Sequence, residues 1–187
     1  MNKKTTALTV EQYENIISLL KNGGNHFRKS EQVALACVLE ANLGIRISDI
    51  LKLKLSDIVK EGDRLHLNII EQKTQKSRQF TVLPEIYQYL QSYCINNKIG
   101  ADEIILPITE RAVQKKIAQA CEQLGYENIS SHSFRKFFAT QIYINNNYDI
   151  RLVQELLQHS EIKTTQRYIG ISSAQVENAL KGHLHLL

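Results

Sequence analysis

Six side chains spread along the chain have the types needed to bind and transfer a phosphate group. A guanidinium offers a fork of donors that matches two phosphate oxygens. Histidine exchanges protons near neutral pH, and a tyrosine hydroxyl becomes a useful nucleophile when a neighbouring base accepts its proton. The six are Arg46, Lys73, His132, Arg135, His159 and Tyr168.

His132 and Arg135 are three residues apart at the start of a helix predicted over residues 131–144. This spacing places both on one face, and the free backbone N–H groups of a first helical turn favour an anion there. The opposite, apolar side is expected to be buried: Phe134, Phe137, Phe138 and Ile142. Taken alone, the pair also fits an N-terminal histidine beside a solvent-facing arginine.

Arg46 lies between an apolar helix, predicted over residues 30–44, and a short helix over residues 48–53 that Ser48 would cap. A charge at such a joint is partly buried and needs a partner, which Asp49 could supply. Two interpretations are open. The pair is either an ion pair that joins two helices, or a site arginine that Asp49 orients.

The segment QKTQKSR, residues 72–78, carries three basic residues and no acidic one. Lys73, Lys76 and Arg78 lie at or beside the turn of a predicted hairpin, so a cation there could reach an anionic partner. The alternative is a solvated turn. Further along, His159 and Tyr168 enclose the polar run SEIKTTQR, which alone also fits a packing tyrosine at a helix end.

The composition is that of an ordinary folded protein: 187 residues, 43% hydrophobic and 22% charged, with a net charge of +4. Three cysteines, Cys37, Cys94 and Cys121, lack paired spacing, which predicts reduced, packed thiols in a cytoplasmic protein. No apolar run approaches the roughly 18 residues of a membrane span, and the N-terminus lacks the apolar region of a secretory signal. Without metal-ligand spacing or a Gly-rich phosphate loop, we expect neither a metal nor another cofactor.

Hydrophobic periodicity predicts a mainly α-helical chain with one small three-stranded antiparallel β-sheet. The strands are expected over residues 55–60, 63–70 and 78–83. Capping residues and glycines bound the helices. These are expected over residues 9–23, 30–44, 48–53, 84–97, 109–125, 131–144 and 149–158, around Tyr168, and over residues 172–182.

The order of the six residues, with the segments that carry them, resembles the catalytic domain of the tyrosine recombinases, the phage integrase family. The segments are GIRISDILKL, EQKTQKSRQFTVLP, SSHSFRKFFAT and LLQHSEIKTTQRY. The hairpin lysine and the succession of His-Ser, a threonine pair and tyrosine are the most specific features. The resemblance covers essentially the whole chain and implies the DNA breaking-rejoining fold of that family.

The resemblance also implies a function: site-specific DNA recombination, as integration, excision or inversion, without a metal. Tyr168 would attack a phosphodiester and form a 3′-phosphotyrosine, releasing a 5′-hydroxyl that can later be rejoined. Arg46, Arg135 and His159 would donate hydrogen bonds to the phosphate oxygens as negative charge gathers on them.

Two further residues would move protons in this reaction. His132 would accept the proton of the tyrosine, and Lys73 would protonate the leaving 5′-oxygen, with Lys76 as its rival. The partner is double-stranded DNA. The basic residues expected to contact it are Lys76, Arg78, Arg111, Lys115, Lys116 and Lys136.

The chain departs from the family pattern in two respects. Gln158 stands where the family often has glycine before the histidine, which a helix end tolerates. Most members also carry an N-terminal core-binding domain. We expect residues 1–187 to form a single catalytic domain without it, either as a fragment of a longer recombinase or as a naturally short member, like the fimbrial phase-variation recombinases.

Residues 172–187 are expected to form a C-terminal helix and tail. In the family such a segment packs on a neighbouring subunit, which implies a homotetramer on DNA and a monomer or weak oligomer when free. Folding back on its own core is equally open.

Three other classes of function compete with recombination. A non-catalytic DNA-binding module on the same fold would have no reason to keep all six residues. An enzyme like the type IB topoisomerases shares this site but relaxes supercoils. A metal-dependent nuclease lacks its carboxylate ligands.

Overall fold

The computed structural model describes residues 5–70, 75 and 77–170. Lys73, Lys76 and the predicted helix at residues 172–182 lie outside them. The chain divides into two compact units, Met1–Phe138 and Ala139–Leu187, and helix α6 contributes to both. The expectation of a single catalytic domain stays a prediction.

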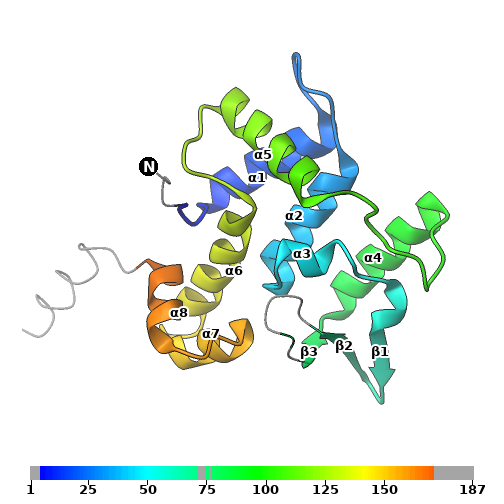
Figure 1. The fold of residues 1–187 in the computed structure, drawn as a ribbon, viewed down its shortest axis with the longest axis vertical. Helices are drawn as coiled ribbons and strands as arrows, with labels where there is room; N and C mark the ends of the chain where they lie inside the picture. The colour runs from blue at the N-terminus through cyan, green and yellow to red at the C-terminus, as the bar shows by residue number, and fades with distance from the viewer. Residues whose placement is uncertain (1–4, 71–74, 76, 171–187) are drawn as a thin grey trace, which may run out of the picture. The chain divides into compact units, whose positions relative to one another are not determined.

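The described residues form eight α-helices, one short 3₁₀ helix and three strands (Figure 1). The expected fold class, mainly helical with a three-stranded antiparallel sheet, is confirmed. The elements are α1 (Val10–Asn22), α2 (Glu31–Leu43), α3 (Ile47–Ile50), η1 (Leu55–Asp57), β1 (Ile58–Glu61), β2 (Arg64–Ile70), β3 (Ser77–Val82), α4 (Pro84–Asn97), α5 (Glu110–Leu124), α6 (Ser131–Asn145), α7 (Ile150–Leu157) and α8 (Ile162–Ile169).

Helix α1 begins as its sequence predicts. The Gln12 backbone N–H donates to Thr9 Oγ1 at 3.1 Å, and the Thr9 N–H donates to Gln12 Oε1 at 3.0 Å, which completes a capping box. Gly23, with φ of 76°, ends the helix.

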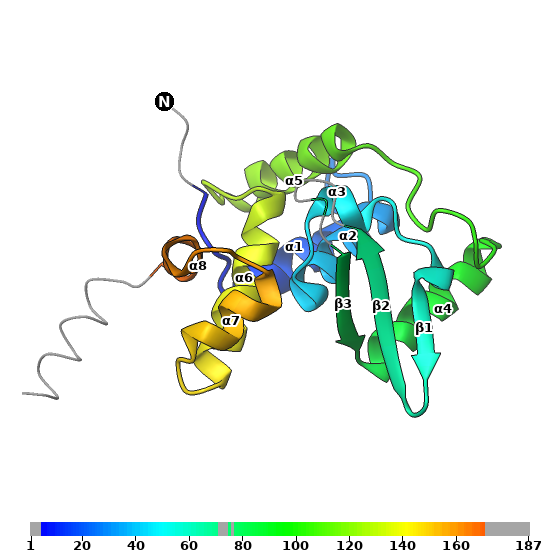
Figure 2. The ribbon, with the colours of Figure 1, turned by 60° about the horizontal axis from the view of Figure 1, so that its bottom comes forward.

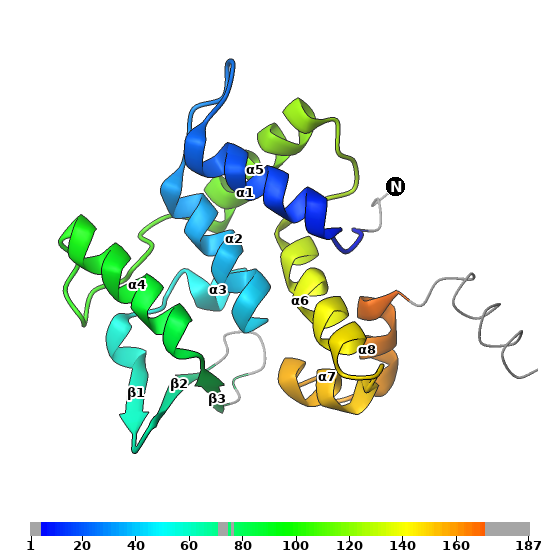
Figure 3. The same cartoon turned by 180° about the vertical axis from the view of Figure 1, so that it is seen from behind.

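The core of the first unit centres on α2, which is buried along most of its length. Helices α1 and α5 pack against it (Figure 3). In α5, Thr109 caps the N-terminus and Gly125 the C-terminus, as expected. The apolar residues that recur along α5 form a stripe whose last member, Leu124, is half-buried, while the others are buried: Val113, Ile117, Ala120 and Cys121.

The sheet has the order β1-β2-β3, with both pairs antiparallel, and α4 runs beside it (Figure 2). The first strand is shorter than the predicted residues 55–60, because η1 occupies its start. There the Lys54 backbone N–H donates to Asp57 Oδ2 at 2.8 Å, and this local bond closes a turn instead of a ladder.

The described part of the second unit, up to residue 170, contains the end of α6 followed by α7 and α8, which pack on each other. Asp149 caps α7 as predicted, since its Oδ1 accepts from the N–H groups of Arg151 and Leu152 at 2.9 and 3.1 Å. Tyr143 and Tyr148 meet edge to face at 5.3 Å.

Two findings bear on what the sequence predicts about the cysteines and about membrane spans. The three cysteines are buried free thiols, as predicted: Cys37, Cys94 and Cys121. Among the described residues, no helix has both the length and the apolar character needed to cross a membrane.

Candidate functional site

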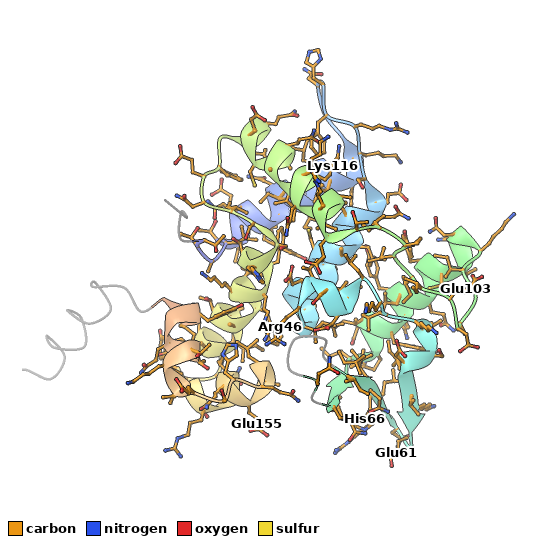
Figure 4. The ribbon with its side chains drawn as sticks, viewed as in Figure 1. Arg46, Glu61, His66, Glu103, Lys116 and Glu155 are labelled. Atoms are coloured by element: carbon orange, nitrogen blue, oxygen red, sulfur yellow. The ribbon has the colours of Figure 1, made fainter. Side chains whose placement is uncertain are left out.

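Arg46 occupies the joint between α2 and α3 (Figure 4). It is the N-cap residue of α3, and its carbonyl accepts from the N–H groups of Asp49 at 2.9 Å and Ile50 at 3.0 Å. The prediction of Ser48 as the cap is wrong, because the extended backbone lies two residues earlier, at Arg46. The Arg46 side chain is half-buried, as expected, and Asp49 is buried one turn later.

His132 and Arg135 lie in the first turns of α6, as predicted, but in different surroundings. His132 is exposed, whereas Arg135 is 0% exposed, so the reading of Arg135 as solvent-facing is wrong. The apolar side of α6 is also less uniform than expected. Phe134 is fully buried, while three of its companions are half-buried: Phe137, Phe138 and Ile142.

The first half of α6 is held against α1 and α2 within the first unit. The Tyr13 ring stacks on Phe137 at 4.9 Å and meets Phe134 edge-on at 6.3 Å. Burial raises the pKa of the Tyr13 hydroxyl, and a hydrogen bond with Asn42 lowers it. These ring contacts fix the part of α6 that carries Arg135.

His159 follows directly after α7, where the chain turns out of the helix. The His159 N–H donates to the Gln154 carbonyl at 3.0 Å, and the Gln154 side-chain amide donates back to the His159 carbonyl at 3.0 Å. Gln158 has φ of 51° and ψ of 42°, the left-handed conformation that glycine adopts most easily. The departure from the family pattern at Gln158 therefore falls at a helix end, as expected.

The His159 ring is oriented by α8. Its Nδ1 lies 3.0 Å from Oγ1 of Thr165, a fully buried residue, and its ring meets that of Tyr168 edge to face at 5.1 Å. Tyr168 is half-buried in the last turn of α8.

Thr165 and Gln154 support His159, and the sequence analysis missed both. The polar run after His159 gave a signal for Thr165. To predict the contact of Thr165 with His159, one would have to know that α7 and α8 pack on each other.

The predicted DNA contacts have different surroundings. Arg111 and Lys115 are exposed on α5. Lys116 lies over the Phe27 ring at 3.9 Å, where burial and the charge of nearby Arg28 lower its pKa. The Lys136 amino group donates to the Thr5 carbonyl, so it already has an acceptor in the chain. Arg78 belongs to β3.

The structure groups the candidate residues into two sets. The first unit carries Arg46, His132 and Arg135, and the second carries His159 and Tyr168. Lys73 lies outside the described residues. The first set holds two guanidinium groups, one half-buried and one fully buried. The second pairs a hydroxyl with an oriented imidazole.

Known proteins with similar sequences are recombinases and integrases. The chain is 32% identical over 145 residues to a probable integrase/recombinase, YoeC of Bacillus subtilis, covering 75% of this chain and 78% of YoeC. It is 28% identical over 186 residues to the tyrosine recombinase XerC of Leptospira interrogans, covering 94% of this chain and 58% of XerC. The chain thus spans little more than half of that relative.

Solved structures show the same fold. The XerH recombinase in a post-cleavage complex with palindromic difH superposes with a TM-score of 0.74 at 22% identity, over 96% of this chain and 53% of XerH. The catalytic domain of the bacteriophage HP1 integrase gives a TM-score of 0.66 at 18% identity, over 96% of both chains. The fold expected from the sequence, that of tyrosine recombinase catalytic domains, is confirmed.

The sequence pattern of the phage integrase family matches residues 6–175, nearly the whole chain. That match includes every segment on which the resemblance rested and all six candidate residues. The chain belongs to the phage integrase family.

Proposed function

We propose that this chain cleaves and rejoins DNA in site-specific recombination, with Tyr168 as the nucleophile. The observation that carries the proposal is the cluster of Tyr168, His159 and Thr165, in a chain that belongs to the phage integrase family. A tyrosine that served packing alone would have no need of an imidazole beside its ring, oriented by a buried hydroxyl.

The proposed step is a transfer of the phosphoryl group from DNA to the protein. The Tyr168 Oη attacks phosphorus, the new O–P bond forms, and the bond from phosphorus to the 5′-oxygen breaks. The proton of Tyr168 passes to His132, and Lys73 supplies a proton to the 5′-oxygen. Rejoining runs the same steps in reverse with the 5′-hydroxyl of another strand, so the phosphodiester energy is retained.

The charge that develops on the phosphate requires fixed donors. Arg46 and Arg135 would bind the non-bridging oxygens, and His159 would donate from Nε2. The half-buried and buried positions of the two arginines support this assignment, because charge pairs are stronger away from water. Asp49, buried one turn after Arg46, would support Arg46.

The partner of this reaction is double-stranded DNA. Among the matched structures, XerH is bound to its difH substrate and the Tn1549 transposon integrase to circular intermediate DNA. For this chain we propose the same class of partner, contacted through basic side chains that include Arg111 and Lys115 on α5. A homotetramer on DNA, with the C-terminal segment packing on a neighbouring subunit, belongs to the same proposal. Topoisomerase-like relaxation would use the same chemistry, but the similar proteins are named for recombination and integration.

A suicide substrate tests the proposal. The protein is incubated in EDTA with duplexes nicked beside candidate cleavage sites, and a covalent protein–DNA adduct is sought. We expect an adduct with wild type and with Tyr143→Phe, a matched change in the second unit, and none with Tyr168→Phe. An adduct that persists in Tyr168→Phe, or that disappears in EDTA, contradicts the mechanism. No adduct on any substrate would favour a non-catalytic DNA-binding module.

A further inference from the structure

A short non-helical segment, residues 5–9, precedes α1 and is anchored in the first unit at its C-terminal end. Leu8 is only 4% exposed and belongs to the core. Thr9 caps α1 through reciprocal hydrogen bonds with Gln12. We call residues 5–9 the N-terminal strap, and it lies beside the start of α6 (Figures 1 and 3). The strap therefore has a fixed end from which it can hold a neighbouring element.

Hydrogen bonds join the strap and α1 to the loop that leads into α6. The Thr6 backbone N–H donates to the Asn128 carbonyl at 3.1 Å. On α1, the Asn15 side-chain amide donates to the Tyr126 hydroxyl at 2.8 Å and so joins residues 111 positions apart in sequence. These two bonds hold the loop between α5 and α6 against the N-terminal part of the chain.

The strap is also bonded to α6 itself. The Lys136 amino group donates to the Thr5 carbonyl, and a hydrogen bond with a charged donor is roughly twice as strong as a neutral one. On the same stretch of α6, Phe137 stacks on the Tyr13 ring of α1 and Phe134 meets that ring edge-on. The strap and α1 thus hold α6 at three residues within about one helical turn.

Arg135 lies between two of these held residues. Its neighbours in sequence are Phe134, which Tyr13 contacts, and Lys136, which the strap holds. Successive residues of an α-helix point about 100° apart, so contacts at both neighbours resist rotation of α6 about its axis. A rotation or shift of α6 would move the Arg135 guanidinium together with the helix.

We propose that Lys136 is a positioning residue, which with the N-terminal strap fixes α6 in the orientation where Arg135 meets the phosphate. The role rests on the proposed function, because it assigns a purpose to the neighbour of a proposed phosphate-binding residue. Lys136 acts through the helix and touches neither the phosphate nor the reacting atoms. The competing hypothesis is that Lys136 contacts DNA, and the two hypotheses predict different effects of its substitution.

The first test is Lys136→Met, which removes the amino group and keeps an unbranched side chain. With saturating suicide substrate, we expect adduct formation to slow by about tenfold or more, because small misplacements of a donor have such effects. Affinity for duplex DNA should change less than about threefold and its salt slope should stay that of wild type, whereas loss of a phosphate contact lowers the slope by about 1. Lys136→Arg, which can still donate to the Thr5 carbonyl, should recover part of the rate.

Lys60→Met is a matched control for the loss of a positive charge. Lys60 is exposed on β1, and this variant should cleave as fast as wild type. A folded Lys136→Met that cleaves at the wild-type rate overturns the proposal. A salt slope lowered by about 1 at an unchanged saturated rate also overturns it, because Lys136 would then be a DNA contact.

Thr6→Pro tests the strap through its other hydrogen bond. Proline has no N–H, so the bond to the Asn128 carbonyl is lost. Val10→Pro is the matched control, because Val10 is the first residue of α1, is 50% exposed and occupies the position where helices tolerate proline. Thr6→Pro should slow adduct formation and Val10→Pro should not. Equal rates in the two variants count against the strap as a positioning element and overturn the proposal.

Amide hydrogen exchange without DNA gives a readout that is independent of cleavage. In Lys136→Met, the amides in the first half of α6 should exchange about tenfold faster than in wild type, because loss of the bond favours local opening. Those of α4 should be unchanged. Unchanged exchange in α6, or equal acceleration in both helices, overturns the proposal.

This measurement separates the proposal from the proposed function. Absence of an adduct with wild type on any substrate counts against the proposed function, and hydrogen exchange still shows whether the strap holds α6. If Lys136→Met fails to fold, the same comparison of α6 with α4 in Thr6→Pro decides the outcome.

Discussion

Substitution of Gly44 by alanine should damage both stability and the candidate site. Gly44 ends α2 with φ of 58°, and a Cβ added there would lie 2.3 Å from Cδ1 and Cε1 of Phe138 on α6. Alanine in this backbone conformation costs about 1–2 kcal/mol, and overpacking of a well-packed site adds about 1–3 kcal/mol. We therefore expect Gly44→Ala to lower the free energy of unfolding by about 2–5 kcal/mol.

Gly125→Ala is a matched control for the backbone term. Gly125 ends α5 with φ of 69°, and a Cβ there meets nothing within 4 Å. Its substitution should cost only the conformational part, about 1–2 kcal/mol. Urea denaturation of both variants isolates the packing term, and equal losses would refute the close approach of Gly44 and Phe138.

The same pair of variants tests the link to chemistry. Gly44 precedes Arg46 by two residues, and Phe138 follows Arg135 by three, so the clash in Gly44→Ala pushes apart the segments that carry the two arginines. Displacements of this kind slow catalysis by about a hundredfold per ångström, so adduct formation should fall in folded Gly44→Ala and not in Gly125→Ala. In a Phe138→Ala background, the cost of Gly44→Ala should drop to that of the control, as a double-mutant cycle measures.

Three further outcomes are expected. Thr165→Val should slow adduct formation about two- to tenfold by removing the hydroxyl 3.0 Å from His159, while Thr165→Ser stays near wild type; equal rates in single-turnover assays would contradict the contact. Burial raises the pKa of Cys121 to about 11 from 9.0, so the unfolded thiol ionises first and the free energy of unfolding should fall as pH rises through that window. In urea denaturation across that pH range, the free energy of unfolding should fall less in Cys121→Ala than in wild type. A pH dependence that is the same in both would contradict the raised pKa of Cys121. In DNA-binding titrations, Arg111→Ala should reduce the salt slope by about 1, and Lys116→Ala by less, because Lys116 already lies over an aromatic ring; equal reductions would refute this difference.

The sequence was most informative where local chemistry decides the structure. The start of α1 is marked by the capping box of Thr9 and Gln12, and the start of α7 by Asp149, through side-chain hydrogen bonds to nearby backbone groups. Gly125 marks the end of α5. The order of candidate residues along the chain predicted the family in the same way, because a family's motifs are read without knowledge of their contacts.

How deeply a candidate side chain lies in the core was less predictable from the sequence. The spacing of His132 and Arg135 places them on one helical face, yet one is exposed and the other buried, because His132 lies in the first turn and Arg135 lies deeper in α6. No local pattern predicts this difference, since it depends on which helices pack together.

Most candidate residues occupy the ends of elements. Arg46 is the N-cap residue of α3, His132 lies in the first turn of α6, His159 follows the C-cap of α7, and Tyr168 lies in the last turn of α8. A side chain at an element's end can reach a ligand while the body of the element stays committed to the core. Arg135 is different because it lies further into its helix and is fully buried, so its charge must be compensated from within the protein. Arg135 therefore depends on the core of the first unit for its charge balance, whereas His159 depends on hydrogen bonds made by α7 and α8.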